Sequence, residues 1–181
     1  YRGIKSAVMS PSSQLAVVGE IQPRNVFAGL PGANVWESDA AGLQLGIGVR
    51  GMSPNRSAHL SMRQNGHPIA ADPLGYPESY YTPPMTMVDE VQWVSGASAL
   101  QYGSQLGGML NFVMRPAPLG KATMARWTTS LTGYTPREGT MRGHGHVFAE
   151  ASGGGPSTGF LVAVDHKAGS GWRDNADFES T

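Results

Sequence analysis

The sequence predicts an α+β fold in residues 1–118, followed by antiparallel β-strands in residues 119–181. In the first part, short apolar runs alternate with turn residues, and few segments favour a helix. In the second part, polar and apolar residues alternate over segments of about ten residues, which is typical of strands with two different faces. Pro116-Ala117-Pro118 separates the two parts as a linker, because proline cannot donate to a β-ladder.

The composition excludes several classes of protein. The chain has no cysteine, which excludes disulfides and thiolate metal sites. Its 13 basic and 13 acidic residues give zero net charge, which argues against nucleic-acid binding through phosphate contacts. The 25 glycines and 13 prolines, with only 14% charged residues, indicate a turn-rich β fold. No apolar run reaches the roughly 18 residues of a membrane-spanning helix, whereas the short strands of a barrel escape such a search.

The first 42 residues contain short, weakly patterned elements. Apolar residues in 4–8 predict a short strand, and the apolar run 15–21 fits either a strand or a helix. Pro23 suits the first position of a short helix over 23–28, which Pro31-Gly32 ends. Residues 34–42 are predicted to form a polar loop.

Four strands are expected to form a small central sheet in the first part. Residues 45–50 and 59–64 alternate in polarity, so each is predicted to have one apolar face. Asn65-Gly66 then predicts a two-residue hairpin, because both residues tolerate positive φ. The other two strands are 90–95 and 109–114, which are rich in Val, Trp, Leu, Phe and Met.

The segments that join these strands are irregular. Residues 72–84, with three tyrosines and four prolines, are predicted to form a long loop. Between the last two strands, residues 97–102 are expected to form one or two helical turns, with Ser98 as a cap. Gly107 and Gly108 allow a close backbone approach or a positive φ before the next strand.

The second part is predicted to be an antiparallel meander of three strands, at 122–134, 140–152 and 157–167. On the middle strand the polar side chains share one face: Arg142, His144, His146 and Glu150. Strands of about ten residues with one polar and one small or apolar face are typical of the wall of an outer-membrane barrel.

Residues 90–111 carry the most specific motif of the chain. This segment resembles the end of the plug domain of TonB-dependent outer-membrane receptors, and the resemblance extends over about residues 14–178. The positions that fit the family signature are Glu90, Val91, Val94, Gly96, Ser98, Leu100, Tyr102, Gly103, Gly107, Gly108 and Asn111. The chain departs from the family at Ser95, where an arginine is usual.

The loop at residues 72–84 is similar to the ferric-citrate branch of the same family. That branch has a run of the form P-Y-G-x-P-E-x-Y-Y-x-P-P. The residues of this chain that fit the run are Pro73, Gly75, Pro77, Glu78, Tyr80, Tyr81, Pro83 and Pro84.

The resemblance implies an α+β plug domain at 1–118, followed by antiparallel β-strands of a truncated transmembrane β-barrel at 119–181. Because barrels of outer-membrane transporters have about 22 strands, the chain is expected to be the N-terminal part of a longer protein. The implied location is the outer membrane of a Gram-negative bacterium. The implied function is active import of a ferric chelate, either ferric citrate or another siderophore.

The implied partners follow from that function. They are TonB with its inner-membrane energising complex, the ferric chelate as transported ligand, and outer-membrane lipid, with no nucleic acid. No cofactor and no enzymatic activity are implied. The alternative is a soluble, secreted β-rich binding module without a transport role, whose sheet would have covered edges.

Five residues of the loops expected to face outward are the candidate ligand-binding residues: Arg56, His59, Tyr76, Tyr80 and Tyr81. An arginine fork matches the carboxylates of a citrate chelate, and tyrosines supply amphipathic walls. The tyrosines have an alternative role, which is to pack the long loop onto the barrel wall.

Two further residues are expected to connect plug and barrel. Arg50 lies in a segment that resembles the family's I-R-G box, and Glu90 belongs to the signature. Without the resemblance, Arg50 reads as a solvated strand end.

Neither a metal site nor a catalytic site is predicted. His144 and His146 lie two apart on one face of a strand and could together bind a metal such as Zn²⁺ or Ni²⁺. No third ligand has a helpful spacing, so a polar stripe facing the barrel lumen is the preferred interpretation. No carboxylates pair as acid and base, and no serine has the context of a nucleophile.

Overall fold

The structure, a computed structural model, describes residues 5–9, 24–27, 30, 32–38, 42–71, 76–95, 97–102, 105–134, 141–171 and 175–181. The chain divides into two compact units; the first contains a five-stranded and a two-stranded sheet, and the second a four-stranded sheet. Unit 1 consists of Tyr1–Ser38 and Gly42–Met114, and unit 2 of Asp39–Ala41 and Arg115–Thr181. The predictions for residues 15–21 and for the Ser98 cap lie outside the residues and side chains that the structure describes.

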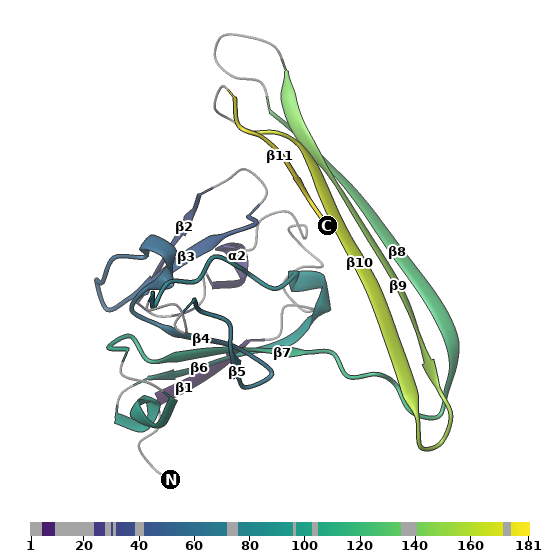
Figure 1. Cartoon of the computed structure of the whole chain (residues 1–181), viewed down its shortest axis with the longest axis horizontal. Coiled ribbons are helices and arrows are strands. Elements are labelled where there is room, and N and C mark those ends of the chain that lie inside the picture. Colours follow the sequence, from purple (N-terminus) through teal and green to yellow (C-terminus); the bar gives the residue numbers. More distant parts are fainter. Residues whose placement is uncertain are drawn as a thin grey trace. The chain divides into compact units, whose positions relative to one another are not determined.

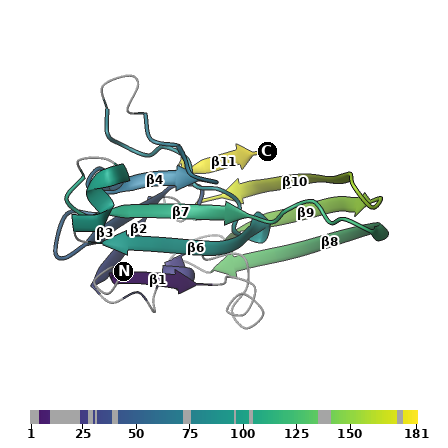
Figure 2. The ribbon, with the colours of Figure 1, turned by 90° about the horizontal axis from the view of Figure 1, so that it is seen from below.

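Unit 1 is built on a five-stranded sheet in the order β1-β6-β7-β4-β5 (Figure 1). The strands are β1 (Lys5–Met9), β4 (Ser61–Gln64), β5 (His67–Pro68), β6 (Val88–Ser95) and β7 (Met109–Met114). Figure 2 shows β4, β7, β6 and β1 side by side. Only the β4–β7 pair is parallel within this sheet. The predicted strands near 4–8, 59–64, 90–95 and 109–114 are therefore confirmed.

One apolar core fills unit 1. Val91, Leu110 and Phe112 of the sheet are fully buried, and burial of such a side chain contributes about 1.5–3 kcal/mol. The predicted short helix is present as α2 (Arg24–Phe27), whose Phe27 ring meets Phe112 edge-on at 6.4 Å between centroids. The helix therefore closes the core against the sheet.

Two predictions for residues 34–50 are wrong. Residues 33–37 form the strand β2 (Ala33–Glu37) and not a loop, and β3 (Leu45–Val49) pairs with β2 and not with the central sheet. The polar residues Asn34 and Glu37 hid the strand: Asn34 lies on its exposed face, and Glu37 lies on the other face, where it forms an ion pair with Arg24. Its Val35 packs against the core of unit 1.

The apolar face predicted for β3 is confirmed in Leu45, Ile47 and Val49, and the second face of the strand is buried as well. Its second face consists of Gly46 and Gly48, and the backbone of the following segment lies directly on them. A Cβ on Gly46 would lie 2.3 Å from the carbonyl oxygen of Pro54. A Cβ on Gly48 would lie 2.3 Å from the carbonyl oxygen of Met52. The absence of side chains on this face thus lets residues 52–57 cover the strand.

The turns of unit 1 agree with the local sequence. Asn65 and Gly66 have φ of 48° and 82°, as the predicted hairpin requires. The helical turns expected at 97–102 are a 3₁₀ helix, η4 (Ala97–Tyr102), and two shorter ones are η1 (Asn55–Ser57) and η3 (Met85–Met87). Residues 76–84, the described part of the predicted long loop, contain no helix or strand.

Unit 2 is an antiparallel meander in the order β11-β10-β9-β8 (Figure 1). Its strands are β8 (Lys121–Tyr134), β9 (Arg142–Gly154), β10 (Gly159–Ser170) and β11 (Asp177–Ser180). The three predicted strands are confirmed, and the fourth was missed because it has only four residues. Within the described residues β8 and β11 each pair on one side only, so the sheet is open.

The two faces of unit 2 differ in burial. Along β9, His144, His146 and Phe148 are buried, whereas Val147 between them is exposed. Arg115, at the start of unit 2, forms an ion pair with Glu150 and so fixes the linker to β9. Among the residues that the structure describes, no helix has the length and apolar character needed to cross a membrane.

Candidate functional site

The site begins with an unusual turn at the end of η1. Arg56 and Ser57 have φ of 49° and 53°, a left-handed conformation that is unfavourable for residues with a Cβ. The fully buried Ser57 hydroxyl compensates: it accepts a hydrogen bond from Ile47 N (2.9 Å) and donates one to Leu45 O (3.2 Å). Ser57 thus fixes the turn to β3, while the Arg56 side chain stays 47% exposed.

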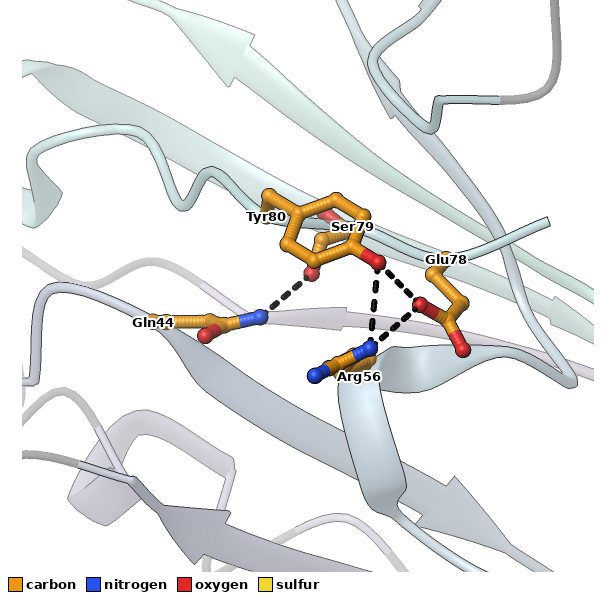
Figure 3. A network of polar contacts seen from close by, with 5 residues as sticks. All are labelled: Gln44, Arg56, Glu78, Ser79 and Tyr80. Atoms are coloured by element: carbon orange, nitrogen blue, oxygen red, sulfur yellow. Dashed lines mark hydrogen bonds and ion pairs between the residues drawn. The ribbon is translucent and has the colours of Figure 1, made fainter. Parts of the chain in front are cut away.

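The loop of residues 76–84 is held against this turn by its backbone. Ser79 N donates to Arg56 O (2.8 Å), and Gln44 Nε2 donates to Ser79 O (2.9 Å; Figure 3). Further along, the Thr82 hydroxyl accepts a hydrogen bond from Leu45 N (3.1 Å). Two segments that are distant in sequence, 42–57 and 76–84, are therefore joined at the residues that carry the candidate side chains.

Three side chains from these segments meet and form what we term the Arg56 cluster: Arg56, Glu78 and Tyr80. Arg56 Nη1 donates to Glu78 Oε2 (2.9 Å) and to the Tyr80 hydroxyl (3.1 Å; Figure 3). The Tyr80 hydroxyl donates to the same Glu78 oxygen. The Arg56 guanidinium carbon also lies 5.1 Å from the centroid of the Tyr80 ring, a cation–π distance.

The cluster is electrostatically neutral. The hydrogen bond from Tyr80, and then the one from Arg56, hold the pKa of Glu78 below its ordinary value of 4.5. The hydrogen bond to Glu78 in turn raises the pKa of Arg56 and that of the Tyr80 hydroxyl. At neutral pH the site therefore holds an ionised carboxylate, a guanidinium and an uncharged phenol.

The other predicted ligand-binding residues are not part of the Arg56 cluster. His59 is half-buried, and its carbonyl accepts a hydrogen bond from Gly107 N (2.8 Å). Tyr76 and Tyr81 are 59% and 45% exposed. Glu78 was missed as a site residue, because no local pattern connects this carboxylate to an arginine 22 positions earlier.

The two residues predicted to connect plug and barrel lie in different parts of unit 1. Arg50 follows β3 in an exposed turn with φ of 56°, and its N donates to Gly32 O (3.1 Å). Glu90 on β6 accepts a hydrogen bond from Gln92 (2.6 Å), which itself accepts one from Asn111 (3.1 Å). Their role between plug and barrel stays a prediction.

The histidine pair of β9 has its own partners. His146 Nε2 lies 2.7 Å from Asp165 Oδ2, and the His144 ring lies 5.7 Å from that of Phe178. Within the described ranges, no group of three or more His, Cys, Asp or Glu residues is arranged to hold a metal ion.

Comparisons with known proteins point to one family. A family model described as the TonB-dependent receptor plug domain matches residues 4–109. The structure of the ferric citrate transporter FecA in its unliganded form superposes with a TM-score of 0.73 at 24% identity, over 96% of this chain and 27% of FecA.

Two siderophore receptors have the same fold. The siderophore receptor PirA from Acinetobacter baumannii matches with a TM-score of 0.65 at 16% identity, over 91% of this chain and 24% of that one. The ferric enterobactin receptor PfeA from Pseudomonas aeruginosa, with a Q482A substitution and enterobactin bound, matches with a TM-score of 0.64 at 16% identity. The match covers 91% of this chain and 25% of that one. The chain thus spans about a quarter of the solved structures that it matches.

Proposed function

This chain belongs to the TonB-dependent receptor plug domain family, and we propose that it is the plug and the first barrel strands of a receptor that imports a ferric chelate. The proposed boundaries are 1–118 for the plug and 119–181 for the barrel strands. The proposed location is the outer membrane of a Gram-negative bacterium. The similar solved structures support this role, since they are a ferric citrate transporter and siderophore receptors.

The exposed face of unit 2 supports a location in a membrane. Large apolar side chains of β8, β9 and β10 are exposed on it: Trp127, Leu131, Val147, Phe160, Val162 and Val164. In water such a face would favour aggregation, whereas lipid would cover it. The soluble alternative is not favoured, because it requires covered edges and the described sheet is open.

The ligand-binding part of the proposal depends on one observation, the exposed guanidinium of Arg56 beside the ring of Tyr80. Among the described residues only Nη1 of Arg56 forms hydrogen bonds, so Nε and Nη2 are available to a ligand. This remaining edge can bind a carboxylate with two parallel hydrogen bonds. The ligand that fits best is a ferric chelate with carboxylate groups, and ferric citrate is the first candidate.

The proposed transport mechanism follows that of the family. The plug blocks the barrel, the chelate binds to the outward loops, and TonB acts on the plug from the periplasm with energy from the inner-membrane proton gradient. In this mechanism His59, Tyr76 and Tyr81 line the entrance with the Arg56 cluster, and Arg50 and Glu90 connect plug and barrel. The role is transport, without a catalytic step.

The proposal is tested by titrating the purified full-length protein with ferric citrate and then with other ferric siderophores. We expect Arg56→Ala to weaken the binding of a carboxylate chelate by about tenfold, because a charge-assisted pair of hydrogen bonds is lost. Arg24→Ala is the matched control, since Arg24 is also exposed and paired with a glutamate, Glu37.

Two results would contradict the proposal. Wild-type affinity in both Arg56→Ala and a variant with Tyr76, Tyr80 and Tyr81 all changed to alanine would show that the plug loops are not the binding surface. Failure of the wild-type protein to bind any ferric chelate would remove the proposed import function itself.

A further inference from the structure

We propose that Arg56 and Tyr80 form a carboxylate-binding site that the chain's own Glu78 fills, and that a carboxylate-bearing ligand binds by exchanging with Glu78. The inference rests on the proposed function and adds a residue that determines specificity. Glu78 acts in it as an internal competitor, so its carboxylate sets which ligands can bind and how tightly.

The geometry around Glu78 is that of a small anion site. Two donors from different side chains, Arg56 Nη1 and the Tyr80 hydroxyl, converge on one oxygen, Oε2 of Glu78 (Figure 3). The other oxygen, Oε1, has no hydrogen-bond partner among the residues that the structure describes. The carboxylate is therefore recognised through a single oxygen, although the donors would serve any carboxylate equally well.

A ligand carboxylate can make more hydrogen bonds to Arg56 than Glu78 does. Glu78 contacts only Nη1 and does so through one oxygen, whereas a ligand carboxylate that takes its place can bind Nη1 and Nη2 together through both oxygens in the fork geometry. The cost of the exchange is small, because ion pairs between exposed side chains contribute little to stability. The Arg56 and Glu78 side chains are 47% and 24% exposed, so solvent reaches both.

The exchange does not require the loop to unfold. The backbone bond from Ser79 N to Arg56 O and the bond from Gln44 to Ser79 O do not involve the Glu78 side chain. Ser79 is itself 2% exposed, and its hydroxyl donates to Tyr81 O (2.9 Å). The Glu78 side chain can therefore swing out while residues 76–84 keep their place.

This arrangement predicts selectivity among ligands. A ligand with one weakly binding carboxylate gains little over Glu78, whereas a chelate that presents several carboxylates gains enough to displace it. Removing the charge of Glu78 leaves Arg56 with an uncompensated positive charge, which strengthens binding of carboxylate chelates. It leaves the binding of an uncharged chelate unchanged.

The test compares the full-length wild-type protein with Glu78→Gln, which keeps the shape and removes the charge. Asp89→Asn is the matched control, because it makes the same change in net charge at an exposed carboxylate of β6. The probes are ferric citrate and an uncharged ferric trihydroxamate. We expect Glu78→Gln to bind ferric citrate about three- to tenfold more tightly than the wild type. Asp89→Asn should bind ferric citrate with wild-type affinity, and neither variant should change the affinity for the trihydroxamate.

The single variant Arg56→Ala and the double variant Arg56→Ala/Glu78→Gln test whether the effect depends on Arg56. The gain from Glu78→Gln must disappear when Arg56 is also changed to alanine, because the exchange takes place on that guanidinium. A gain that persists without Arg56 overturns the inference, as does equal or weaker ferric citrate binding by Glu78→Gln. In either case, binding of a ferric chelate by the wild type leaves the proposed function intact. If neither the wild type nor Glu78→Gln binds any ferric chelate, both proposals fall.

Discussion

Gly108 shows how a single position can carry two constraints at once. Its φ of 102° is unfavourable for other residues, and a Cβ there would lie 2.3 Å from the carbonyl oxygen of Val94. Gly107 beside it is equally enclosed, since its Cβ would lie 2.6 Å from the His59 carbonyl oxygen. The expectation of a close approach or a positive φ at this pair is therefore confirmed, and both occur.

We expect Gly108→Val to destabilise the plug by about 2–4 kcal/mol, because the side chain meets backbone atoms that cannot move independently. Thermal unfolding of the full-length protein measures the effect. Gly51→Val is the control that separates backbone strain from steric overlap. Gly51 also has a positive φ, of 77°, but no atom lies within 4 Å of its Cβ position. Equal losses in the two variants would show that the collision contributes nothing.

At the same scale, the candidate site was only partly predictable. The sequence predicts Arg56 and Tyr80 as residues of outward loops, and the structure brings the two side chains together. Glu78 could not be found in this way, because its contact depends on how residues 76–84 lie against η1. The bonds of Ser79 to Arg56 and Gln44 set that arrangement, and no spacing in the sequence encodes them.

At the scale of elements, η1 and β3 act as one piece because of the buried Ser57 hydroxyl. We expect Ser57→Ala to cost about 1–3 kcal/mol, since Ile47 N loses its buried hydrogen-bond partner. Ferric citrate binding should weaken as well, because Arg56 is then held less firmly. Thermal unfolding and ligand titration of the same variant measure both effects.

Ser53→Ala is the control for that substitution. The Ser53 hydroxyl also accepts a backbone hydrogen bond, from Asn55 N (3.3 Å), but it does so at the exposed surface. Water can replace it there, so we expect little change in stability or binding. A loss in Ser53→Ala equal to that in Ser57→Ala would contradict the importance given to burial.

Local chemistry explains which elements could be predicted. The hairpin at Asn65-Gly66 was predictable because two adjacent residues favour its backbone angles. β2 was not, because Asn34 and Glu37 give it the composition of a loop while pairing with β3 makes it a strand. The prediction that β3 joins the central sheet was wrong because strand pairing depends on contacts between distant segments, which local composition does not reveal.

At the scale of the whole molecule, the family and the fold class could be predicted because the motif at residues 90–111 is specific. The alternating pattern of residues 121–170 also specified the two faces of the meander. The pairing order of the five-stranded sheet was not predictable, since its parallel β4–β7 contact pairs residues 48 positions apart along the chain, such as Ser61 and Met109.

The exposed apolar face gives a prediction for the complete protein. We expect Trp127→Arg to reduce insertion into the outer membrane, because an arginine facing lipid near the middle of a strand costs about 2–4 kcal/mol. Thr128→Arg is the control, since Thr128 lies on the opposite face of β8 and is half-buried, whereas Trp127 is 77% exposed. The amount of folded protein in isolated outer membranes measures insertion, and equal amounts of the two variants would contradict a lipid-facing role.

The edge position of β1 has a mechanical consequence. β1 pairs only with β6, through the residue pairs from Lys5 with Ser95 to Met9 with Val91, and its other side is unpaired among the described strands. A pulling force applied to the chain at Lys5 loads this strand first. β1 can then be peeled from β6 while the bonds between β6, β7 and β4 stay closed. Under tension the plug would therefore unfold in steps, and its edge strand β1 would detach first.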